Sequence, residues 1–382
     1  MRIGIITQPL QANYGGLLQN YALQQILIRE GHDVETIDWD KNRSLKEILY
    51  RVKVVVLSKF YPHKYQKPRY WLTGKEKAII QRETNRFIST YINRTDVIHT
   101  QKGFKAQSDK RCYDAYVVGS DQCWRPLYNA FLPAMFLNFT EGQDVKRISY
   151  AASLGTDKWE FSPEQTALCT PLARKFDLVT VREDSGVKLC KEHFGLDAVQ
   201  VLDPTLLLTK EDYISLIEAD ETPKSSGTLF SYILDPNKTI SSFIQKVADE
   251  LCLTPFQVLP KFQAENRTRE DVKTHIEDCV YPRVTIWLRA FMDAEMVIVD
   301  SFHGMVFAII FNKSFWVIGN AGRGMSRFIS LLKIFHLEDR LLDVGHLENV
   351  NFNQSIDWRM VNSILEGERE KCKFLLLSQL KK

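Results

Sequence analysis

A group of polar residues at positions 300–304 stands between two strongly apolar runs of the sequence. The pentapeptide DSFHG separates Met296–Val299 from Met305–Phe311, which predicts a strand before it and a helix after it. His303 would therefore be partly buried at a helix N-terminus, where an imidazole can act as a general acid or base near neutral pH. A core histidine satisfied by a neighbour is the alternative. The flanking aspartate, serine and glycine favour a functional role.

An arginine at the end of another predicted strand is a candidate anion ligand. Arg182 follows the apolar run Leu178–Val181. A guanidinium in that position can hold a carboxylate or phosphate through two parallel hydrogen bonds. A structural ion pair with Glu183 or Asp203 is the alternative, and the spacing alone favours it.

Two further arginines follow the next apolar run, Phe315–Ile318. Arg323 and Arg327 lie within one short segment, and two cations near His303 would suit an anionic substrate. A plain surface loop is a credible alternative for Arg323. It is less apt for Arg327, which enters an apolar helical pattern.

The N-terminal strand and the glycines after it form another candidate anion site. The apolar run Ile3–Thr7 is followed by Asn13, Gly15 and Gly16, and then by a helical pattern. Glycine allows close backbone approach to a ligand, and a helix N-terminus offers free N–H groups and partial positive charge. A plain strand-to-helix turn explains these residues equally well. Neither GxGxxG nor GxxxxGK[ST] occurs, so dinucleotide or P-loop binding is not expected.

The sequence contains no motif typical of a metal site or of a covalent nucleophile. No group of His, Asp or Glu residues has metal-ligand spacing, and no GxSxG motif is present. We therefore expect a reaction without metal, cofactor or covalent enzyme intermediate.

Short apolar runs alternate with longer amphipathic stretches, which is the pattern of a parallel sheet with crossover helices. The predicted strands are Ile3–Thr7, Val34–Ile37, Ala115–Val118, Arg147–Ala152, Leu178–Val181, Val199–Leu202, Leu229–Leu234, Phe256–Leu259, Met296–Val299 and Phe315–Ile318. The predicted helices are Leu17–Glu30, Lys77–Tyr91, Ser241–Leu251, Val284–Asp293, Met305–Phe311 and Met360–Leu380, and another is expected to start near 182–186.

The pattern begins again after a largely polar stretch, so the chain is predicted to be α/β with two similar halves. We expect an N-terminal domain over 1–208, a linker over 209–227, a second domain over 228–357 and a C-terminal helix over 358–382. A cleft should lie between the halves. Ligands in such sheets bind beyond the carboxyl ends of the strands, where the polar clusters described above are found.

Composition is that of an ordinary globular protein. The chain has 382 residues, 45% of them apolar, and a net charge of +3 (50 − 47), too small for a protein that coats nucleic acid. Seven cysteines without a CxxC pair indicate neither a disulfide framework nor a zinc site, and favour a reducing cytosol. No window reaches the roughly 18 apolar residues of a membrane span, and the N-terminus lacks the pattern of a signal peptide.

Charge is concentrated in one segment, residues 41–86. It contains thirteen Lys and Arg against three Glu, a local charge of +10, so the rest of the chain sums to −7 (3 − 10). Aromatic residues are interleaved with these cations. A solvated surface insertion is the slightly favoured interpretation, and an anionic membrane surface or a phosphorylated lipid carrier is the next. An RNA-binding face is weaker, because no RNA-binding module accompanies it.

Taken together, six motifs resemble the polysaccharide pyruvyl transferase family. They occur in the family's order and cover most of residues 1–335. The motifs are NYGGLLQNYAL at 13–23, VGSDQCWR at 118–125, SYAASLG at 149–155, VREDSG at 181–186, DPT at 203–205 and DSFHG at 300–304.

This resemblance implies two Rossmann-like domains facing across a cleft, as in GT-B glycosyltransferases. It also implies transfer of pyruvate from phosphoenolpyruvate to two hydroxyls of a sugar, which gives a cyclic ketal and phosphate. Residues matching Arg182 and His303 lie in the phosphoenolpyruvate site of the family. Some members carry an arginine two residues before that histidine. Ser301 stands there in this chain, so Arg327 or Arg323 would supply the missing cation.

Carried onto this sequence, the resemblance suggests a role for each candidate residue. His303 would deliver a proton to the donor, and Asp121 would take the proton from the sugar hydroxyl. Gln122, Trp124 and Ser153 would contact the acceptor. The expected donor-binding residues are Asn13, Gly15, Gly16, Arg182, Ser301, Gly304, Arg323 and Arg327.

The expected partner is a sugar in a surface polysaccharide or in its lipid-linked precursor, such as an undecaprenyl-diphosphate oligosaccharide, and no nucleic acid. The protein would work in the cytoplasm, at the inner face of the membrane if the basic segment binds there. A glycosyltransferase that uses a nucleotide sugar is the rival enzyme. A non-enzymatic protein that binds an anionic glycan is the second alternative.

Overall fold

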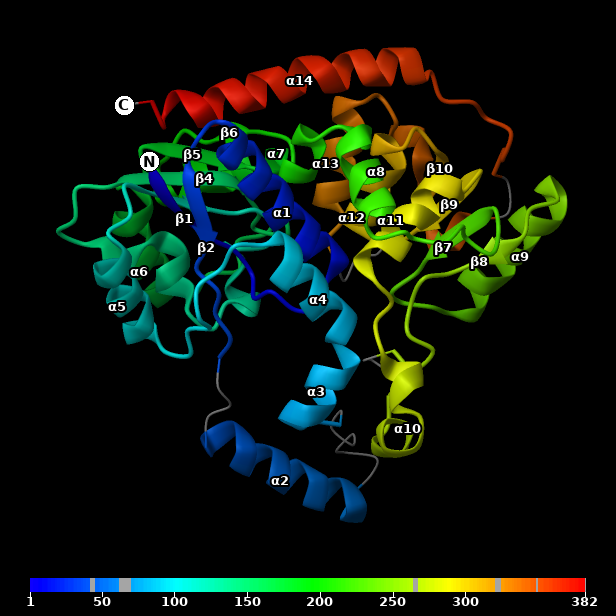
Figure 1. The fold of residues 1–382 in the computed structure, drawn as a ribbon, viewed down its shortest axis with the longest axis horizontal. Coiled ribbons are helices and arrows are strands. Elements are labelled where there is room, and N and C mark those ends of the chain that lie inside the picture. Colours follow the sequence, from blue (N-terminus) through cyan, green and yellow to red (C-terminus); the bar gives the residue numbers. More distant parts are fainter. Residues whose placement is uncertain (42–44, 62–69, 264–266, 320–323, 348–349, 382) are drawn as a thin grey trace.

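The computed structural model describes residues 1–41, 45–61, 70–263, 267–319, 324–347 and 350–381. It contains two α/β domains side by side, each built on a wholly parallel sheet with helices packed against it (Figure 1). The predicted fold class is therefore confirmed.

The first sheet has the strand order β2-β1-β3-β4-β5-β6. Its inner strands are short runs of buried apolar residues, as expected of parallel strands covered on both faces. The strands are β1 (Arg2–Ile6), β2 (Asp33–Thr36), β3 (Ala115–Val118), β4 (Lys146–Ala152), β5 (Leu178–Val181) and β6 (Val199–Gln200). The helices that precede the second sheet are α1 (Tyr14–Arg29), α2 (Leu45–Phe60), α3 (Gly74–Ile80), α4 (Arg82–Tyr91), α5 (Gln101–Arg111), α6 (Pro163–Ala173), α7 (Asp184–Leu189) and α8 (Lys210–Ala219).

The second sheet has the order β11-β10-β9-β7-β8. Its strands are β7 (Leu229–Tyr232), β8 (Pro255–Phe256), β9 (Met296–Val299), β10 (Ser314–Ile318) and β11 (Leu341–Leu342). The helices of this part are α9 (Lys238–Leu251), α10 (Arg269–Thr274), α11 (Val284–Asp293), α12 (Phe302–Ile310), α13 (Ser326–Ile334) and α14 (Trp358–Ser378).

The segment 209–227, expected to be a polar linker, contains the helix α8. Thr209 and Asp212 form a reciprocal capping box at its start. Tyr213, Leu216 and Ile217 lie on one face at helical spacing, and all three are buried. The polar residues that suggested a linker are the exposed side of this helix, so the irregular connection to β7 starts only after Ala219.

Helix α14 crosses from the second domain back onto the first (Figure 1). The guanidinium of Arg369 donates hydrogen bonds to the carbonyl oxygens of Leu206 and Leu208, at 2.9 and 3.2 Å. The backbone N–H of Leu202 donates to the thiol of Cys372. Helix α14 therefore belongs to the packing of the first domain, although the second domain precedes it in the chain.

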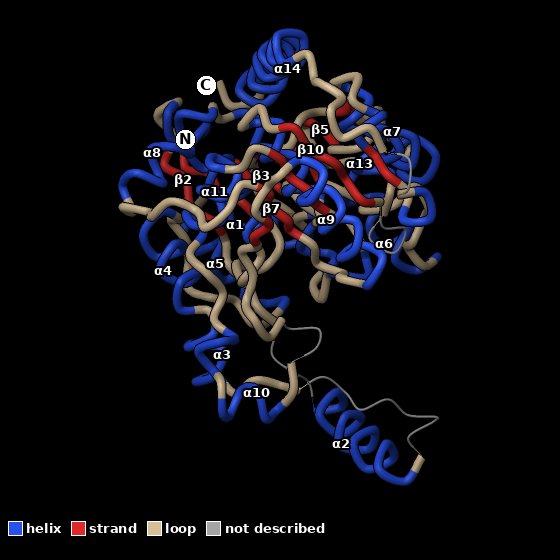
Figure 2. The backbone as a smooth tube through the Cα atoms, turned by 90° about the vertical axis from the view of Figure 1, so that its right-hand side faces the viewer, coloured by secondary structure: helices blue, strands red, loops and turns tan. Residues whose placement is uncertain are grey.

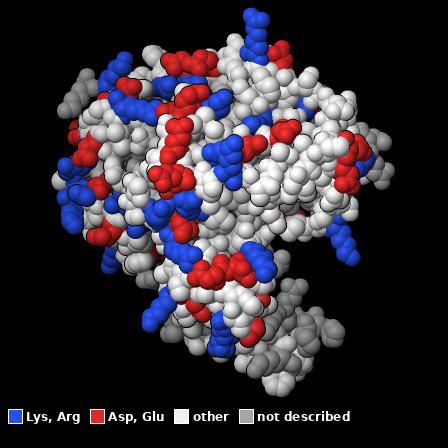
Figure 3. All heavy atoms as spheres, turned by 45° about the vertical axis from the view of Figure 1, so that its right-hand side comes forward, with Lys and Arg blue, Asp and Glu red and all other residues white. Residues whose placement is uncertain are grey.

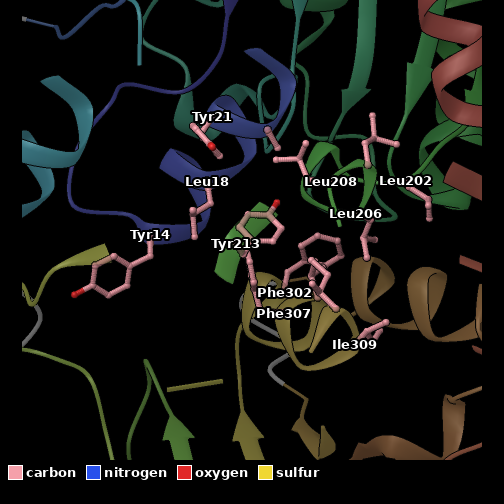
Figure 4. Packing of buried hydrophobic residues seen from close by; sticks show 14 of the residues in the cluster. Tyr14, Leu18, Tyr21, Leu202, Leu206, Leu208, Tyr213, Phe302, Phe307 and Ile309 are labelled. Atoms are coloured by element: carbon pink, nitrogen blue, oxygen red, sulfur yellow. The ribbon is translucent and has the colours of Figure 1, made fainter. Parts of the chain in front are cut away.

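One apolar core continues from the first domain into the second. It contains residues of α1 and of the segment after β6, together with α8, α11 and α12. Figure 4 shows Tyr14 and Leu18 of α1, Tyr213 of α8 and Phe302 and Phe307 of α12 gathered in this region. The hydroxyl of Tyr14 also donates to the carbonyl of Pro282 at 2.9 Å. These contacts hold the two domains together by burial of apolar surface.

Helices α2 and α3, which belong to the described part of the basic segment 41–86, project from the body. Figures 1 and 2 both show α2 at the far end of this projection, with α3 and α10 between α2 and the sheets. The single helix expected over Lys77–Tyr91 is two helices, α3 and α4, which meet at Gln81. Among the described residues, no helix has the length and apolar character needed to cross a bilayer.

We expect Leu376→Ala in α14 to lower the free energy of unfolding by about 2–5 kcal/mol, because Leu376 is fully buried and its removal leaves a cavity. Chemical denaturation would measure the change. Phe374→Ala is the matched control, since Phe374 lies in the same helix and is 67% exposed. The control should stay within about 0.5 kcal/mol of the original protein. Equal effects of the two changes would show that α14 is not packed as described.

Candidate active site

A pocket of about 120 Å³ lies where the two domains meet. Residues that follow β1 and β3 come from the first domain, and residues that follow β7, β9 and β10 come from the second. The carboxyl ends of parallel strands carry the ligand sites of such sheets, so the position is the expected one. The lining residues are Asn13, Gly15, Asp121, Gln122, Tyr128, Tyr232, Leu234, Trp287, Asp300, Ser301, Phe302, His303, Arg327 and Phe328.

A buried carboxylate, Asp203, lies behind the pocket. It follows β6 and is fully shielded from solvent. Its Oδ2 accepts hydrogen bonds at 2.8 Å from the guanidinium of Arg182 and from the hydroxyl of Ser120, and its Oδ1 accepts two from Thr205. Burial alone would raise the pKa of Asp203, but His303 and Arg182 outweigh it and hold the pKa well below the usual range. Asp203 is therefore a fixed negative charge.

His303, a residue of the second domain, lies next to the Asp203 carboxylate. Its Nε2 lies 3.6 Å from Oδ2 of Asp203 and has no hydrogen-bond partner among the described residues. The imidazole is packed so closely on α1 that a Cβ at Gly15 would come within 2.1 Å of Nδ1. Gly15 is needed at this position because only a residue without a side chain leaves room for the ring. The imidazole of the second domain thus lies beside two parts of the first domain, the Asp203 carboxylate and the N-terminus of α1.

Arg182 does not line the pocket, contrary to its expected role as a direct donor ligand. Its guanidinium is buried and is held by Asp203 at 2.8 Å and by Asp121 at 3.3 Å. The structural ion pair considered as the alternative is the arrangement found. Arg182 also lies 4.2 Å from the centre of the Phe302 ring, and Phe302 does line the pocket. Its role is to fix the residues that form the pocket wall.

Arg327 is the described arginine that reaches the pocket. Its guanidinium carbon lies 5.9 Å from the centre of the Phe302 ring. The ring is therefore close to the guanidinium groups of both Arg182 and Arg327, near enough for a cation–π attraction to each. Burial, together with the nearby charge of Arg182, lowers the pKa of Arg327 to about 10. The side chain remains positive at neutral pH and suits an anion. Arg323 lies outside the described residues.

Two helix N-termini from different domains meet at the pocket. Asn13 caps α1 by accepting from the N–H of Gly16 at 3.2 Å, and Ser301 caps α12 by accepting from the N–H of Gly304 at 3.0 Å. The first N–H groups of each helix lack intrahelical partners and carry partial positive charge. Asn13, Gly15, Ser301 and His303 all line the pocket. The resulting site favours a small anion.

Asp121 supplies a negative charge on the opposite wall. It follows β3 in the left-handed conformation, with φ of 59°, which is uncommon for a residue with a side chain. Burial would raise its pKa, but Arg182, His303 and Arg327 outweigh this effect and lower the pKa. Asp121 is thus ionised and can accept a hydrogen bond from a hydroxyl. Gln122, the next residue, also lines the pocket.

Four other predicted site residues are structural. Trp124 is fully buried, its indole donates to the carbonyl of Met135 and its ring stacks on Phe136 at 5.0 Å, so it cannot contact a sugar. Ser153 is buried and donates to Glu183 at 2.8 Å. The remaining two, Gly16 and Gly304, use their N–H groups in the helix caps and do not line the pocket.

Several pocket residues were not identified from the sequence. Tyr232 ends β7, and its position at the carboxyl end of a strand is the signal that could have revealed it. Asp300 was recognised within its cluster, and both of its carboxylate oxygens accept backbone N–H groups, those of Leu234 and Asp235. Tyr128 and Trp287 carried no local signal.

A second hollow of about 190 Å³ adjoins the first. Asn13, Tyr232 and Leu234 line both, so the two spaces are neighbours that share a wall. The remaining lining is mostly apolar, with one amide side chain. These residues are Ala12, Leu259, Pro260, Gln263 and Tyr281.

We expect Asp203→Asn to lower the free energy of unfolding by about 3–5 kcal/mol at pH 7, because the change leaves the charge of Arg182 buried without its main partner. Urea denaturation would measure it. Asp33→Asn is the matched control, since Asp33 pairs with Arg2 at 3.0 Å on the surface, where such pairs contribute about 0–1 kcal/mol.

The loss of stability caused by Asp203→Asn should depend on pH. The folded-state pKa of Asp203 is lowered, so its contribution is complete above the unfolded pKa of about 3.9 and is lost as the pH falls below it. The gap in stability between the original protein and Asp203→Asn should therefore narrow below about pH 5. A gap that does not change with pH would contradict the assigned ionisation of Asp203.

Comparisons with known proteins agree with this architecture. A solved structure named as a UDP-N-acetylglucosamine 2-epimerase from Listeria monocytogenes aligns with a TM-score of 0.50 and 9% identity, over 97% of this chain and 90% of that one. The corresponding enzyme of Methanocaldococcus jannaschii aligns at 0.48 with 11% identity, over 96% and 99%. That of Neisseria meningitidis aligns at 0.47 with 12% identity, over 99% and 100%.

The first of these similarities confirms the GT-B-type arrangement of two Rossmann-like domains. No curated protein sequence matches the chain. The family model of polysaccharide pyruvyl transferases matches residues 13–322, a span that contains all the pocket-lining residues except Arg327 and Phe328. The chain belongs to the polysaccharide pyruvyl transferase family.

Proposed function

We propose that this protein transfers pyruvate from phosphoenolpyruvate to two hydroxyls of a sugar and forms a cyclic ketal. The acceptor belongs to a surface polysaccharide or its lipid-linked precursor, and the reaction takes place in the cytoplasm. The observation that carries the proposal is the pocket itself, in which His303, Arg327 and two helix N-termini surround one small space. Membership of the family supports the class of reaction.

The pocket suits the donor in charge. Arg327 and the first turns of α1 and α12 would hold the carboxylate and phosphate.

His303 would act as the general acid. Phosphoenolpyruvate is an enol ester of phosphoric acid, so a proton added to its methylene carbon makes a methyl group and an oxocarbenium-like centre. The first sugar hydroxyl attacks this centre and loses its proton. The second hydroxyl then displaces phosphate, and its proton leaves with the phosphate, so the products are the ketal and inorganic phosphate. Asp203, 3.6 Å from the ring, balances the charge of the imidazole whenever it is protonated.

Asp121 would accept the proton of the attacking hydroxyl. It lines the same pocket as His303, and its ionised form is favoured by the cations around it. Arg182 acts through other residues: it holds Asp121 and Asp203 in place and supports Phe302 from behind.

The adjoining hollow would bind the acceptor. It opens from the donor pocket at Asn13 and Tyr232, so a sugar held there can present its hydroxyls to the donor. Tyr232, Tyr281 and Pro260 offer apolar surfaces against which a sugar ring can pack, and Gln263 offers an amide for hydrogen bonds. This position replaces the acceptor site expected at Trp124 and Ser153.

The central test is phosphate release from phosphoenolpyruvate in the presence of a panel of lipid-diphosphate glycans, with the product identified by the mass gain of one pyruvyl ketal. His303→Ala should lower turnover roughly 10²–10⁴-fold, the usual contribution of a positioned general acid. His346→Ala is the matched control, because His346 is exposed and does not line the pocket. It should keep full turnover. Undiminished turnover in a folded His303→Ala protein would overturn the assigned role.

Thermal unfolding in the presence of ligands separates the rival functions. Phosphoenolpyruvate should raise the unfolding temperature, because a ligand that binds only the folded protein stabilises it. Protection by nucleotide sugars instead would indicate a glycosyltransferase. Protection by glycans without phosphate release would indicate a binding protein.

The acceptor site is tested by Gln263→Ala. The change should raise the KM for the acceptor about tenfold, the effect expected for one lost hydrogen bond of roughly 1.4 kcal/mol, with little change in the KM for phosphoenolpyruvate. Steady-state kinetics with each substrate varied in turn would measure both constants. Gln245→Ala, an exposed glutamine of α9, should change neither. A rise confined to the KM for phosphoenolpyruvate would show that the acceptor does not bind in this hollow.

A further inference from the structure

Helix α2 exposes an apolar face that nothing in the described part of the chain covers. Ile48, Leu49, Val52, Val55, Val56 and Phe60 are all exposed. Their spacings of one, three or four residues place them on one side of a helix. We call this side the α2 face. Large exposed apolar side chains gathered on one side of a helix are typical of an interaction site.

The α2 face is exposed because of where the fold places the helix. Figures 1 and 2 show the helix at the tip of the projection, away from both sheets. Behind it, α3 is attached to the second domain by a small separate core in which Ile80, Val272 and Cys279 are buried. Arg82 adds an ion pair to Glu277 at 2.8 Å. The projection is therefore anchored at its base, and its tip points outward.

The charge of residues 41–69, the stretch of sequence that contains α2, indicates the kind of partner. Residues 41–69 contain nine Lys and Arg and one Glu, a net charge of +8 (9 − 1). Such a charge opposes the pairing of this face with the same face of a second copy, and it attracts an anionic surface. On the face of the body that Figure 3 presents, acidic and basic side chains are interspersed.

We propose that the α2 face docks on an anionic lipid membrane, with the helix lying in the plane of the interface. An apolar face together with abundant Lys and Arg is the composition of interfacial helices. The helix has 16 residues, fewer than the roughly 20 that a spanning helix needs. This interaction is independent of the proposed reaction, because none of its residues lines either hollow.

Docking would also orient the acceptor hollow. Tyr281 lines that hollow and packs against the small core that anchors the projection, and its backbone N–H donates to the carbonyl of Ile80 at 3.0 Å. Tyr281 therefore connects the acceptor hollow to the base of the projection.

The test is flotation of the purified full-length chain with vesicles, first of phosphatidylcholine alone and then of equal parts of phosphatidylcholine and phosphatidylglycerol. We expect flotation with the anionic vesicles and little with the neutral ones. The double variant Leu49→Glu/Phe60→Glu should reduce the bound fraction at least about tenfold, because it places two charges on the apolar face. Binding should also fall at 1 M salt, which screens surface charges beyond about 3 Å.

Leu168→Glu and Phe374→Glu are the matched controls, since both residues are exposed apolar positions outside α2. They should float as the original protein does. Light scattering should show the original protein to be monomeric. Failure of the original protein to float, or equal flotation of the double variant, would overturn the proposal. A dimer that the double variant dissociates would instead make the α2 face a contact between two copies.

Discussion

The site depends on the buried carboxylate of Asp203, which has neighbours from both domains. Asp203 is fully shielded, so its charge has to be compensated by neighbours. Arg182, from the same domain, provides the closest compensation, and His303, from the other domain, provides the second. The fixed carboxylate thus helps to position the His303 imidazole of the opposite domain. Arg182 extends this arrangement to Asp121 and Phe302, so both walls of the pocket are fixed by one ion pair.

Two consequences follow for the electrostatics of the pocket. The charges of Arg182 and Asp203 largely cancel behind the wall, which leaves Arg327 and the two helix N-termini as the positive elements that face the ligand. These elements are partly desolvated before any ligand arrives, and an anion that enters meets dipoles that are already oriented. Such preorganisation makes electrostatic stabilisation effective in active sites. Phe302 lies close to the guanidinium groups of both the structural arginine, Arg182, and the ligand-facing arginine, Arg327.

The sequence predicted the central strands most accurately and missed two helices, α8 and α2, for opposite reasons. Ala115–Val118, Leu178–Val181 and Met296–Val299 were placed to the residue, because central parallel strands are uninterrupted apolar runs. Helix α8 was missed, since its exposed face is polar and hid the three core residues. Helix α2 was missed for the opposite reason, because it is apolar without being buried.

The candidate site was predicted in part for a similar reason. The correctly predicted residues follow strands or begin helices, and the topology brings them to one pocket. They are Asn13, Gly15, Asp121, Gln122, Ser301, His303 and Arg327. Whether a side chain faces ligand or core depends on tertiary packing that local spacing does not contain. Trp124 fills the core of the first domain, and the charge of Arg182 is satisfied by Asp203.

The return of α14 to the first domain has a consequence for the order in which the protein folds during synthesis. About 150 residues (358 − 208) separate Leu208 from the start of the helix that packs beside it. At roughly 5–20 residues per second on the ribosome, this interval lasts about 8–30 s. For that time the nascent first domain leaves Leu202 and Leu206 without the helix that covers them. Its completion has to await translation of the entire second domain, so the two domains mature together.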